Sequence, residues 1–389
     1  MGISFLSLIA ITFYIGHNTS KNNPAISKKE YHHILHHNYH QVHTHNDSHK
    51  LLDLKSFKYI NQPQCNDSLV DYSNNAKKQV RSLWIITSYA GDPSKRSALR
   101  WAYNSNELKI LGIRRIFLLG TLDDDAQKIT GVSQRAIQSE ANRFNDILQG
   151  NFIEAYKNLT YKHLMGLQWA IDKCSDSYSY IMKMDDDIIV NLYETMNLLK
   201  SKIKINHNED FLMGYMLDNM TPIRNKANKW YVNNQEFSDQ VYPAFLSGWF
   251  YWVNIKTALK LVYQSFLSSK YFWIDDLFIT GILREKAGIH DIINVKEVFT
   301  TDYRFLICCL KNEVSFIRYK CDYIVGPDGG QSTLLSTFQK YSRNCYYRYN
   351  CINRPEGKLI KDKCILDEGN SNLEVGNAHI EEVNFENDS

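Results

Sequence analysis

Short apolar segments alternate with longer amphipathic segments between residues 83 and 184, and this alternation constrains the fold more than any other feature. Residues 83–87 and 113–120 are apolar runs that end in turn residues, and 178–184 is a third such run, which predicts three buried strands. The helical pattern occurs in three segments, residues 97–111, 133–148 and 155–174. Strands that alternate with helices predict a parallel, doubly wound α/β sheet, in which ligands bind at the carboxyl ends of the strands.

The composition is that of a globular protein with a nearly neutral charge. The chain has 389 residues, of which 44% are hydrophobic and 13% aromatic, so it is long enough for a large core. Its 45 Lys and Arg residues nearly balance 42 Asp and Glu residues, which gives a net charge of +3. Charge therefore provides no argument for a nucleic-acid partner.

The N-terminal region has the features of a secretory leader followed by a stem. Residues 3–16 are almost wholly apolar but shorter than the roughly 20 residues of a membrane span, and no Lys or Arg precedes them. We interpret 1–16 as a signal-anchor or signal peptide; the alternative is a buried strand or helix of a cytosolic protein. Residues 17–79 are rich in His and Asn, which predicts a stem of low order.

Other features agree with a secretory route. Eight cysteines are compatible with disulfides in an oxidising lumen, and we expect Cys345, Cys351 and Cys364 to staple the tail. We assign 80–330 to the main domain and 331–389 to a Cys-containing extension with an acidic tail. Six N-x-S/T sequons begin at Asn18, Asn46, Asn66, Asn158, Asn219 and Asn387.

Two runs of three aspartates have the same composition but different surroundings. Asp123–Asp125 lie beyond a strand end and before a polar segment, which is typical of a turn or a helix N-terminus. Asp185–Asp187 instead join two apolar runs directly, so a cation or ligand would offset the repulsion of their charges. In an extended backbone Asp185 and Asp187 point to the same side. This run therefore predicts a D-x-D metal site for a nucleotide-sugar diphosphate.

Ordered blocks of sequence resemble one known family. They are KRSALRWAY (95–103), IFLLG (116–120), the long block from Ser139 to Cys174, YIMKMDDDIIVN (180–191), YPAFLSGWFYWVN (242–254) and IDDLFITGIL (274–283). Their order and spacing between about Leu83 and about Leu283 resemble glycosyltransferase family 31, the β-1,3-galactosyl- and β-1,3-N-acetylglucosaminyltransferases.

The resemblance implies a GT-A fold, an α/β architecture with a single Rossmann-like mixed sheet and helices on both faces. It implies an inverting hexosyltransferase that moves galactose or N-acetylglucosamine from a UDP-sugar to a glycan hydroxyl of a glycoprotein or glycolipid. It further implies a divalent metal, usually Mn²⁺, and a type II Golgi membrane protein with a lumenal catalytic domain.

The resemblance also assigns roles to acidic residues. Asp187 is the first metal ligand and Asp185 the second candidate, and Asp185 and Asp186 assist through water, ribose or donor-sugar contacts. Asp276 matches the position of the base that takes the proton of the acceptor hydroxyl. Asp275 stands where the family usually has Glu, and it is the neighbouring candidate for the same role as base. The alternative for Asp275 and Asp276 is a capping pair at a helix N-terminus.

Further donor contacts are expected from the loop after the first strand. Ser88 and Arg96 are expected near uridine, and Arg100 near the diphosphate, because guanidinium groups suit phosphate; the alternative for Arg100 is a helix-surface ion pair. Lys162 is expected to hold a carboxylate in place, and Gly248 to let the backbone approach the donor. Four aromatic residues are candidates for sugar stacking or for the core: Trp230, Tyr231, Tyr242 and Trp249.

Two departures from the family pattern leave an alternative open. Phe250 stands where the family has a glycine, and the stretch 316–330 lacks the histidine that usually completes the metal site. The alternative function is therefore a catalytically inactive lumenal binding protein or chaperone with the same fold. A calcium module is disfavoured, because neither acidic run has the spacing of a calcium loop.

Overall fold

The computed structural model describes most of the chain after residue 50. The described ranges are 51–54, 56–65, 80–205, 209–268, 270–311, 318–349, 351–366 and 378–380, without the side chains of 332 and 378–380. The apolar run 3–16 and the His-rich stretch 31–50 lie outside these residues. Within the described ranges, no helix combines the length and apolar character that a bilayer crossing requires.

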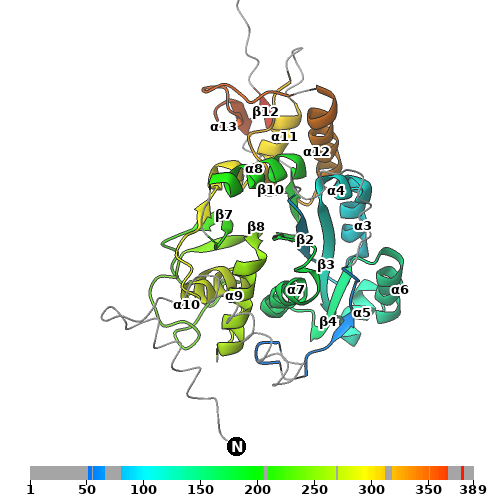
Figure 1. Ribbon diagram of the computed structural model, residues 1–389, viewed down its shortest axis with the longest axis vertical. Coiled ribbons are helices and arrows are strands. Elements are labelled where there is room, and N and C mark those ends of the chain that lie inside the picture. Colours follow the sequence, from blue (N-terminus) through cyan, green and yellow to red (C-terminus); the bar gives the residue numbers. More distant parts are fainter. Residues whose placement is uncertain are drawn as a thin grey trace, which may run out of the picture. The chain divides into compact units, whose positions relative to one another are not determined.

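A mixed eight-stranded sheet forms the centre of the described domain (Figure 1). The neighbouring strands are, in order, β1 (Tyr59–Asn61), β4 (Ile147–Ile153), β3 (Ile113–Thr121), β2 (Ser82–Thr87), β5 (Tyr180–Asp185), β8 (Phe245–Asn254), β7 (Leu212–Leu217) and β9 (Ile293–Asn294). Strands β2 to β5 pair in parallel, whereas β8 is antiparallel to both β5 and β7. The alternation thus predicted three strands of the parallel half, β2, β3 and β5, but not β4, and the mixed sheet expected from the family resemblance is confirmed.

Helices cover both faces of the parallel half, since Figure 1 shows α3, α4 and α6 on one side of β2–β4 and α7 on the other. The main helices are α3 (Pro93–Ala102), α4 (Ser105–Leu111), α5 (Asp124–Thr130), α6 (Gln134–Phe144), α7 (Leu159–Cys174), α8 (Leu192–Ile205), α9 (Ile255–Leu267), α10 (Arg284–Lys286), α11 (Arg304–Leu310), α12 (Ser332–Asn344) and α13 (Ile360–Lys363). Short helical turns are η2 (Tyr156–Asn158), η3 (Leu277–Leu283), η4 (Lys296–Val298) and η5 (Cys345–Tyr349). The predicted α/β class with helices on both faces is confirmed.

Local chemistry explains where several of these elements begin. The side chain of Asp92 caps α3 and Pro93 occupies its first turn. Asp123 caps α5 by accepting from the Ala126 amide at 2.8 Å, so the reading of the first acidic run as a helix start is confirmed. On α7, a β-carbon at Gly166 would lie 2.6 Å from Leu118, so glycine lets this helix pack closely on β3.

Two predicted helices are shorter than the sequence suggested. The segment 97–111 is broken at Tyr103, whose hydroxyl bonds Val190 in the core, and Asn104 caps the following helix. The segment 133–148 ends as helix at Asn145, which adopts a left-handed conformation with φ 49°. Strand β4 then begins at Ile147, where the apolar residues were read as part of the helix. Apolar periodicity over so few residues does not separate a helix end from a strand start.

Two segments that lie outside the predicted 80–330 domain make contacts with it. β1 lies within the expected stem, yet it pairs with β4, and Cys65 forms a disulfide with Cys174. In the expected extension, Gln339 of α12 donates to the Tyr103 hydroxyl at 2.9 Å. Both segments therefore belong to the described domain.

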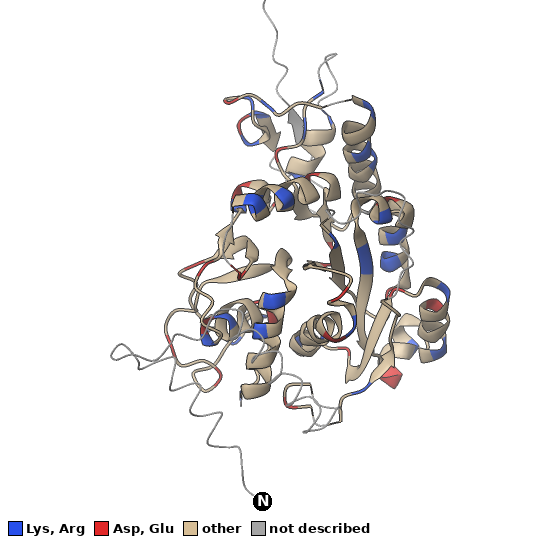
Figure 2. Ribbon diagram, in the orientation of Figure 1, with Lys and Arg blue, Asp and Glu red and all other residues tan. Residues whose placement is uncertain are grey.

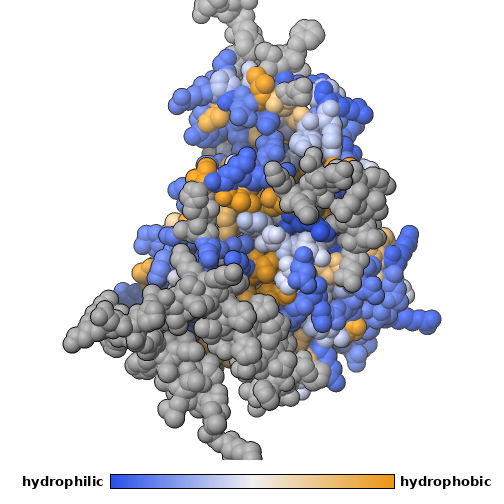
Figure 3. All heavy atoms as spheres, viewed as in Figure 1, coloured by the Kyte–Doolittle hydropathy of each residue, from blue (hydrophilic) through white to orange (hydrophobic). Residues whose placement is uncertain are grey.

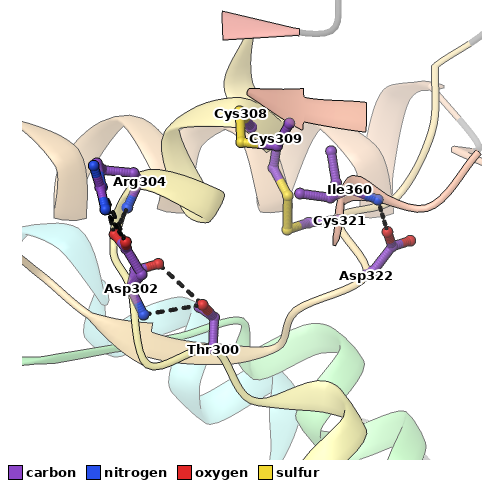
Figure 4. The surroundings of a disulfide bond; sticks show 9 residues. Thr300, Asp302, Arg304, Cys308, Cys309, Cys321, Asp322 and Ile360 are labelled. Carbon is purple, nitrogen blue, oxygen red and sulfur yellow. Dashed lines mark hydrogen bonds and ion pairs between the residues drawn. A yellow bond between two sulfur atoms is a disulfide. The ribbon is translucent and has the colours of Figure 1, made fainter. Parts of the chain in front are cut away.

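All eight cysteines form disulfides. Cys345 pairs with Cys351, as the expected tail staple suggested, but Cys364 pairs with Cys308 of α11 and so ties the tail to the domain. Figure 4 shows the neighbouring Cys309–Cys321 bond and the Asp322 carboxylate that accepts from the Ile360 amide. The cysteine pattern thus predicted disulfides, whereas the partners follow from the packing of α11.

Charged residues are distributed widely over the described part (Figure 2). Figure 2 shows Lys and Arg spread over helices on several sides, as the near-neutral charge suggests. Figure 3 shows a mainly hydrophilic face with apolar residues gathered near its middle.

Candidate functional site

The second acidic run forms a turn at the carboxyl end of β5. Asp185 is the last residue of β5, and Asp186 and Asp187 make the turn into β6 (Ile188–Val190). The extended backbone assumed from the sequence therefore ends at Asp185. The Asp186 amide donates to the Thr87 carbonyl at 3.2 Å, which fixes the turn against the end of β2.

A strand from the C-terminal region brings another carboxylate to this turn. β10 (Val325–Pro327) pairs antiparallel with β6, and the Asp328 amide donates to the Asp187 carbonyl at 2.9 Å. The Asp328 side chain forms an ion pair with Lys95 of α3. Burial would lower the pKa of Lys95, but Asp328, with Asp186 and Asp187, raises it, so this ammonium stays charged.

Asp185 faces a different lysine. Lys183 Nζ, which is almost fully buried, lies 2.6 Å from Asp185 Oδ1 and 3.8 Å from Asp275 Oδ2. Burial raises the pKa of Asp185 to about 7, even though the Lys183 charge opposes the shift. Burial also raises the pKa of Asp186. The turn thus gathers more negative charge than its lysines balance.

Gly248 of β8 connects Lys183 to Asp276. Its carbonyl accepts from Lys183 Nζ at 2.6 Å, and its amide donates to Asp276 Oδ2 at 3.0 Å. A β-carbon at this position would lie 3.2 Å from Lys183 Nζ and 3.3 Å from Asp276, closer than most real contacts. Glycine therefore permits the backbone to approach these two side chains, and the donor contact expected at Gly248 stays a prediction.

Asp276 also caps the helical segment that follows it. Its Oδ1 accepts from the Leu277 amide at 2.8 Å at the start of η3, which has π-helical geometry. The capping alternative is therefore present in the structure. Capping and proton transfer are compatible, because a carboxylate that accepts amide bonds still has free lone pairs.

The neighbouring Asp275 is held by a buried histidine. His163 Nδ1 of α7 lies 2.9 Å from Asp275 Oδ2, and its Nε2 lies 2.5 Å from the Tyr251 hydroxyl. Burial lowers the pKa of His163 and raises that of Tyr251 far above its usual value, so both are uncharged at neutral pH. The partners then assign the protons: Tyr251 donates to Nε2, and Nδ1–H donates to the carboxylate.

The environments of the two aspartates push their pKa values apart. Burial alone would raise the pKa of Asp275, but Lys183 and His163 hold it below its usual range. Burial and then the Asp275 charge raise the pKa of Asp276. When two neighbouring carboxylates have different pKa values, they can take different roles in a protein. Here the ionised Asp275 suits a structural role, and Asp276, with its raised pKa, suits a general base.

The loop after β2 is fastened by Lys162. Its Nζ donates to the Ser88 carbonyl at 2.6 Å and to Glu154 Oε2 at 2.7 Å. The other Glu154 oxygen accepts from the Gly120 amide at 2.7 Å. Lys162 thus holds a carboxylate, as predicted, and it positions Ser88 next to the acidic turn.

The two predicted donor-site arginines are engaged elsewhere. Arg96 is fully buried and bonds Glu140 through two nitrogens at 2.7 and 2.9 Å. Arg100 donates two hydrogen bonds to the Asp146 carboxylate, at 2.7 and 2.9 Å, and a third to Glu140. Their guanidinium groups therefore have carboxylate partners within the fold, and the structure adds no support for a diphosphate contact.

Comparison with known proteins identifies the family. A profile described as Galactosyltransferase matches residues 94–295, which span α3, the acidic turn and the Asp275–Asp276 pair. The chain belongs to the Galactosyltransferase family. It is 35% identical to human beta-1,3-galactosyltransferase 2 over 198 residues, which cover 49% of this chain and 42% of that protein. It is 31% identical to mouse beta-1,3-galactosyltransferase 1 over 256 residues, which cover 64% of this chain and 75% of that protein.

The matched region is thus less than half of the first relative, and activity does not follow from it alone. A solved structure of the galactosyltransferase LgtC, with donor and acceptor sugar analogs, has a TM-score of 0.31 and 8% identity, and covers 70% of this chain and 98% of that one. This likeness is too low to add to the argument.

In this galactosyltransferase-family chain, the carboxylates at the acidic turn suit a divalent cation, because carboxylate oxygens are the ligands that Mg²⁺ and Mn²⁺ prefer. In the described ranges, no group of three or more His, Cys, Asp or Glu side chains is arranged to hold a metal. Such ions are commonly held by one or two carboxylates together with substrate phosphates. The carboxylates of Asp187 and Asp185 suit such an ion by their chemistry, and their pairing as ligands stays a prediction, because Asp185 faces Lys183 in this structure.

Four residues of this site escaped sequence reasoning. Asp328 lies in the stretch 316–330, which lacks the family histidine, and only the β6–β10 pairing places it beside Asp187. Lys95 precedes the predicted helix 97–111 and had no signal that would have assigned it to the site. His163 carried a usable signal, since a polar ring within an apolar helix must find a partner when buried. Tyr251 had no such signal.

Proposed function

We propose that this protein is an inverting glycosyltransferase that moves galactose or N-acetylglucosamine from a UDP-sugar to a glycan hydroxyl, with a β-1,3 linkage. The observation that carries the proposal is Asp276, a largely buried carboxylate with a raised pKa, fixed by Gly248 beside Lys183. A base for a sugar hydroxyl needs a pKa near the working pH and a fixed position, and this residue has both.

In the proposed reaction, the acceptor hydroxyl attacks the anomeric carbon on the face opposite the diphosphate. Its proton passes to Asp276 while the new C–O bond forms. The bond from the anomeric carbon to the diphosphate breaks, and UDP leaves with the electron pair. Asp275 stays ionised throughout because Lys183 and His163 stabilise its charge. Its charge keeps Asp276 a stronger base than an isolated aspartate.

We propose that Asp187 and Asp185 hold a divalent metal, Mn²⁺ by the family resemblance. When bound, such an ion neutralises charge on the departing diphosphate as a Lewis acid. Burial raises the pKa of Asp185 although Lys183 opposes the shift, and a bound cation would add positive charge that favours its ionised form. Ser88 and Lys162 keep the adjacent loop in place for the nucleotide.

We also propose a Golgi location, with the N-terminal apolar run as a membrane anchor and the domain in the lumen. The four disulfides support an oxidising compartment. The acceptor glycan would then be carried by a glycoprotein or glycolipid in the same compartment.

A donor screen tests this function. The full chain is incubated with UDP-galactose, UDP-N-acetylglucosamine or UDP-N-acetylgalactosamine and a panel of glycan acceptors, with Mn²⁺ or with chelator. We expect transfer from one of the first two donors, with Mn²⁺ only, and its loss in Asp276→Asn. UDP binding by calorimetry without transfer or donor hydrolysis would instead support the inactive binding protein.

A further inference from the structure

Two exposed aromatic side chains from distant segments meet close to the acid pair. Tyr156 of η2 is 51% exposed and Trp230 is 44% exposed, and Trp230 Nε1 donates to the Tyr156 hydroxyl at 2.9 Å. This bond satisfies the indole N–H, while the phenol keeps its own proton for another partner. Burial, with the charges of Asp275 and Asp276 adding to it, raises the pKa of Tyr156, so its hydroxyl stays protonated.

Tyr156 is fixed to the segment that leads into the acid pair. Its ring lies 6.0 Å from that of Trp273, which is buried two residues before Asp275. The Tyr271 hydroxyl donates to the Lys157 carbonyl. The Thr160 hydroxyl donates to the Phe272 carbonyl at 2.7 Å. These contacts hold Tyr156 alongside the residues that immediately precede Asp275 and Asp276.

The loop that carries Trp230 is held in place as well. Arg224 donates to the Val232 carbonyl at 2.8 Å and to the Phe237 carbonyl at 2.9 Å, which closes the loop around Trp230. Lys270 Nζ donates to the Gln235 carbonyl at 2.5 Å, which ties the loop to the same segment. Two large rings are thus held partly open to solvent by polar contacts, although their burial would be favourable.

We propose that Tyr156 and Trp230 form the acceptor subsite, which binds a pyranose ring of the glycan. This inference rests on the proposed glycosyl transfer, because it names the substrate that presents its hydroxyl to Asp276. A pyranose has an apolar C–H face that packs on an aromatic ring and hydroxyls at its rim that need polar partners. The paired rings supply the apolar surface, and the Tyr156 hydroxyl and the nearby carboxylates supply the polar partners.

The test separates acceptor binding from donor chemistry. Transfer to glycan and hydrolysis of the UDP-sugar by water are measured side by side for wild type and Trp230→Ala. Both reactions need the donor site and the base, but only transfer needs an acceptor subsite. We expect the ratio of transfer to hydrolysis to fall at least tenfold, with a matching rise in the acceptor KM. Tyr156→Phe should lower the ratio less, because it keeps the ring.

Trp101→Ala is the matched control, since this tryptophan is 75% exposed on α3 and outside the site. An equal ratio in Trp230→Ala and wild type overturns the inference. So does a parallel loss of transfer and hydrolysis in Trp230→Ala, because that identifies a donor or structural role.

A binding measurement covers the case in which the protein does not turn over. Saturation-transfer NMR with methyl β-galactoside, methyl β-N-acetylglucosaminide and N-acetyllactosamine is run on the full chain. Saturable binding of one probe that Trp230→Ala abolishes and Trp101→Ala preserves supports the subsite, even if the proposed reaction fails. If none of the three probes binds, the subsite is rejected.

Discussion

The two adjacent aspartates should respond to the same substitution in opposite ways. Asp276→Asn and Asp275→Asn each remove one charge and keep the size of the side chain. In the first, we expect loss of activity with equal or higher stability. In the second, we expect loss of stability, because Lys183 loses a counter-charge and His163 loses its acceptor.

The sign of the stability change follows from the pKa directions. The folded-state pKa of Asp276 is raised above the pKa of about 4 that an aspartate has in the unfolded chain. The folded protein therefore loses stability as the pH rises from about 4 through the folded-state pKa, and the full loss is present at pH 8. Since a tenfold change in acidity is worth about 1.4 kcal/mol, replacing Asp276 by neutral Asn should stabilise by roughly 0–3 kcal/mol. The pKa of Asp275 is lowered, so it contributes stability above pH 4, and its loss should cost about 1–3 kcal/mol.

Two assays at pH 8 measure these effects. Guanidinium denaturation with intact disulfides gives the unfolding midpoint, and initial rates give kcat/KM. Loss of a general base lowers kcat/KM by roughly 10²–10⁴-fold. Activity of Asp276→Asn within threefold of wild type would refute the base assignment. A lower midpoint for Asp276→Asn than for Asp275→Asn would refute the electrostatic reasoning.

Three further outcomes are expected. His163→Asn can still donate to Asp275, so this variant should keep more activity than His163→Leu. The acid limb of the pH–rate profile should move only in His163→Leu. Identical pH–rate profiles for the two variants would contradict the positioning role of His163. Gly248→Ala should lower kcat at least tenfold and cost about 1–3 kcal/mol in denaturation, because its β-carbon crowds Lys183 and Asp276. Gly131→Ala should destabilise through its left-handed backbone, with φ +69°, without changing kcat, and so controls for a loss of stability alone. Chelation of divalent ions should abolish transfer without moving the thermal midpoint, and full activity in excess chelator would exclude the metal.

The sequence predicted the architecture because its signals are local. Apolar runs and helical periods are set by residues within a few positions of one another, so the strands and helices of the parallel half could be read directly. Failures occurred where a boundary depended on distant contacts. Tyr103 breaks a helix because it bonds Val190, and β4 forms because β1 and β3 flank it.

The candidate site could be predicted only in part for the same reason. The acids at 185–187 and 275–276 were identified from their surroundings and from the family blocks. Arg96 and Arg100 were assigned to the donor, yet their buried partners Glu140 and Asp146 lie more than 40 residues away.

The sequence by itself determined most strands and helices of the parallel half, the family and the acidic chemistry available at the turn. Only the tertiary structure decided which charged partners each aspartate has. The pairing of β6 with β10 places Asp328 beside Asp187, and the packing of α7 places His163 against Asp275. A carboxylate takes its pKa from the charges and burial around it, and these come from segments far apart in the chain. The role of each aspartate is therefore a property of the fold.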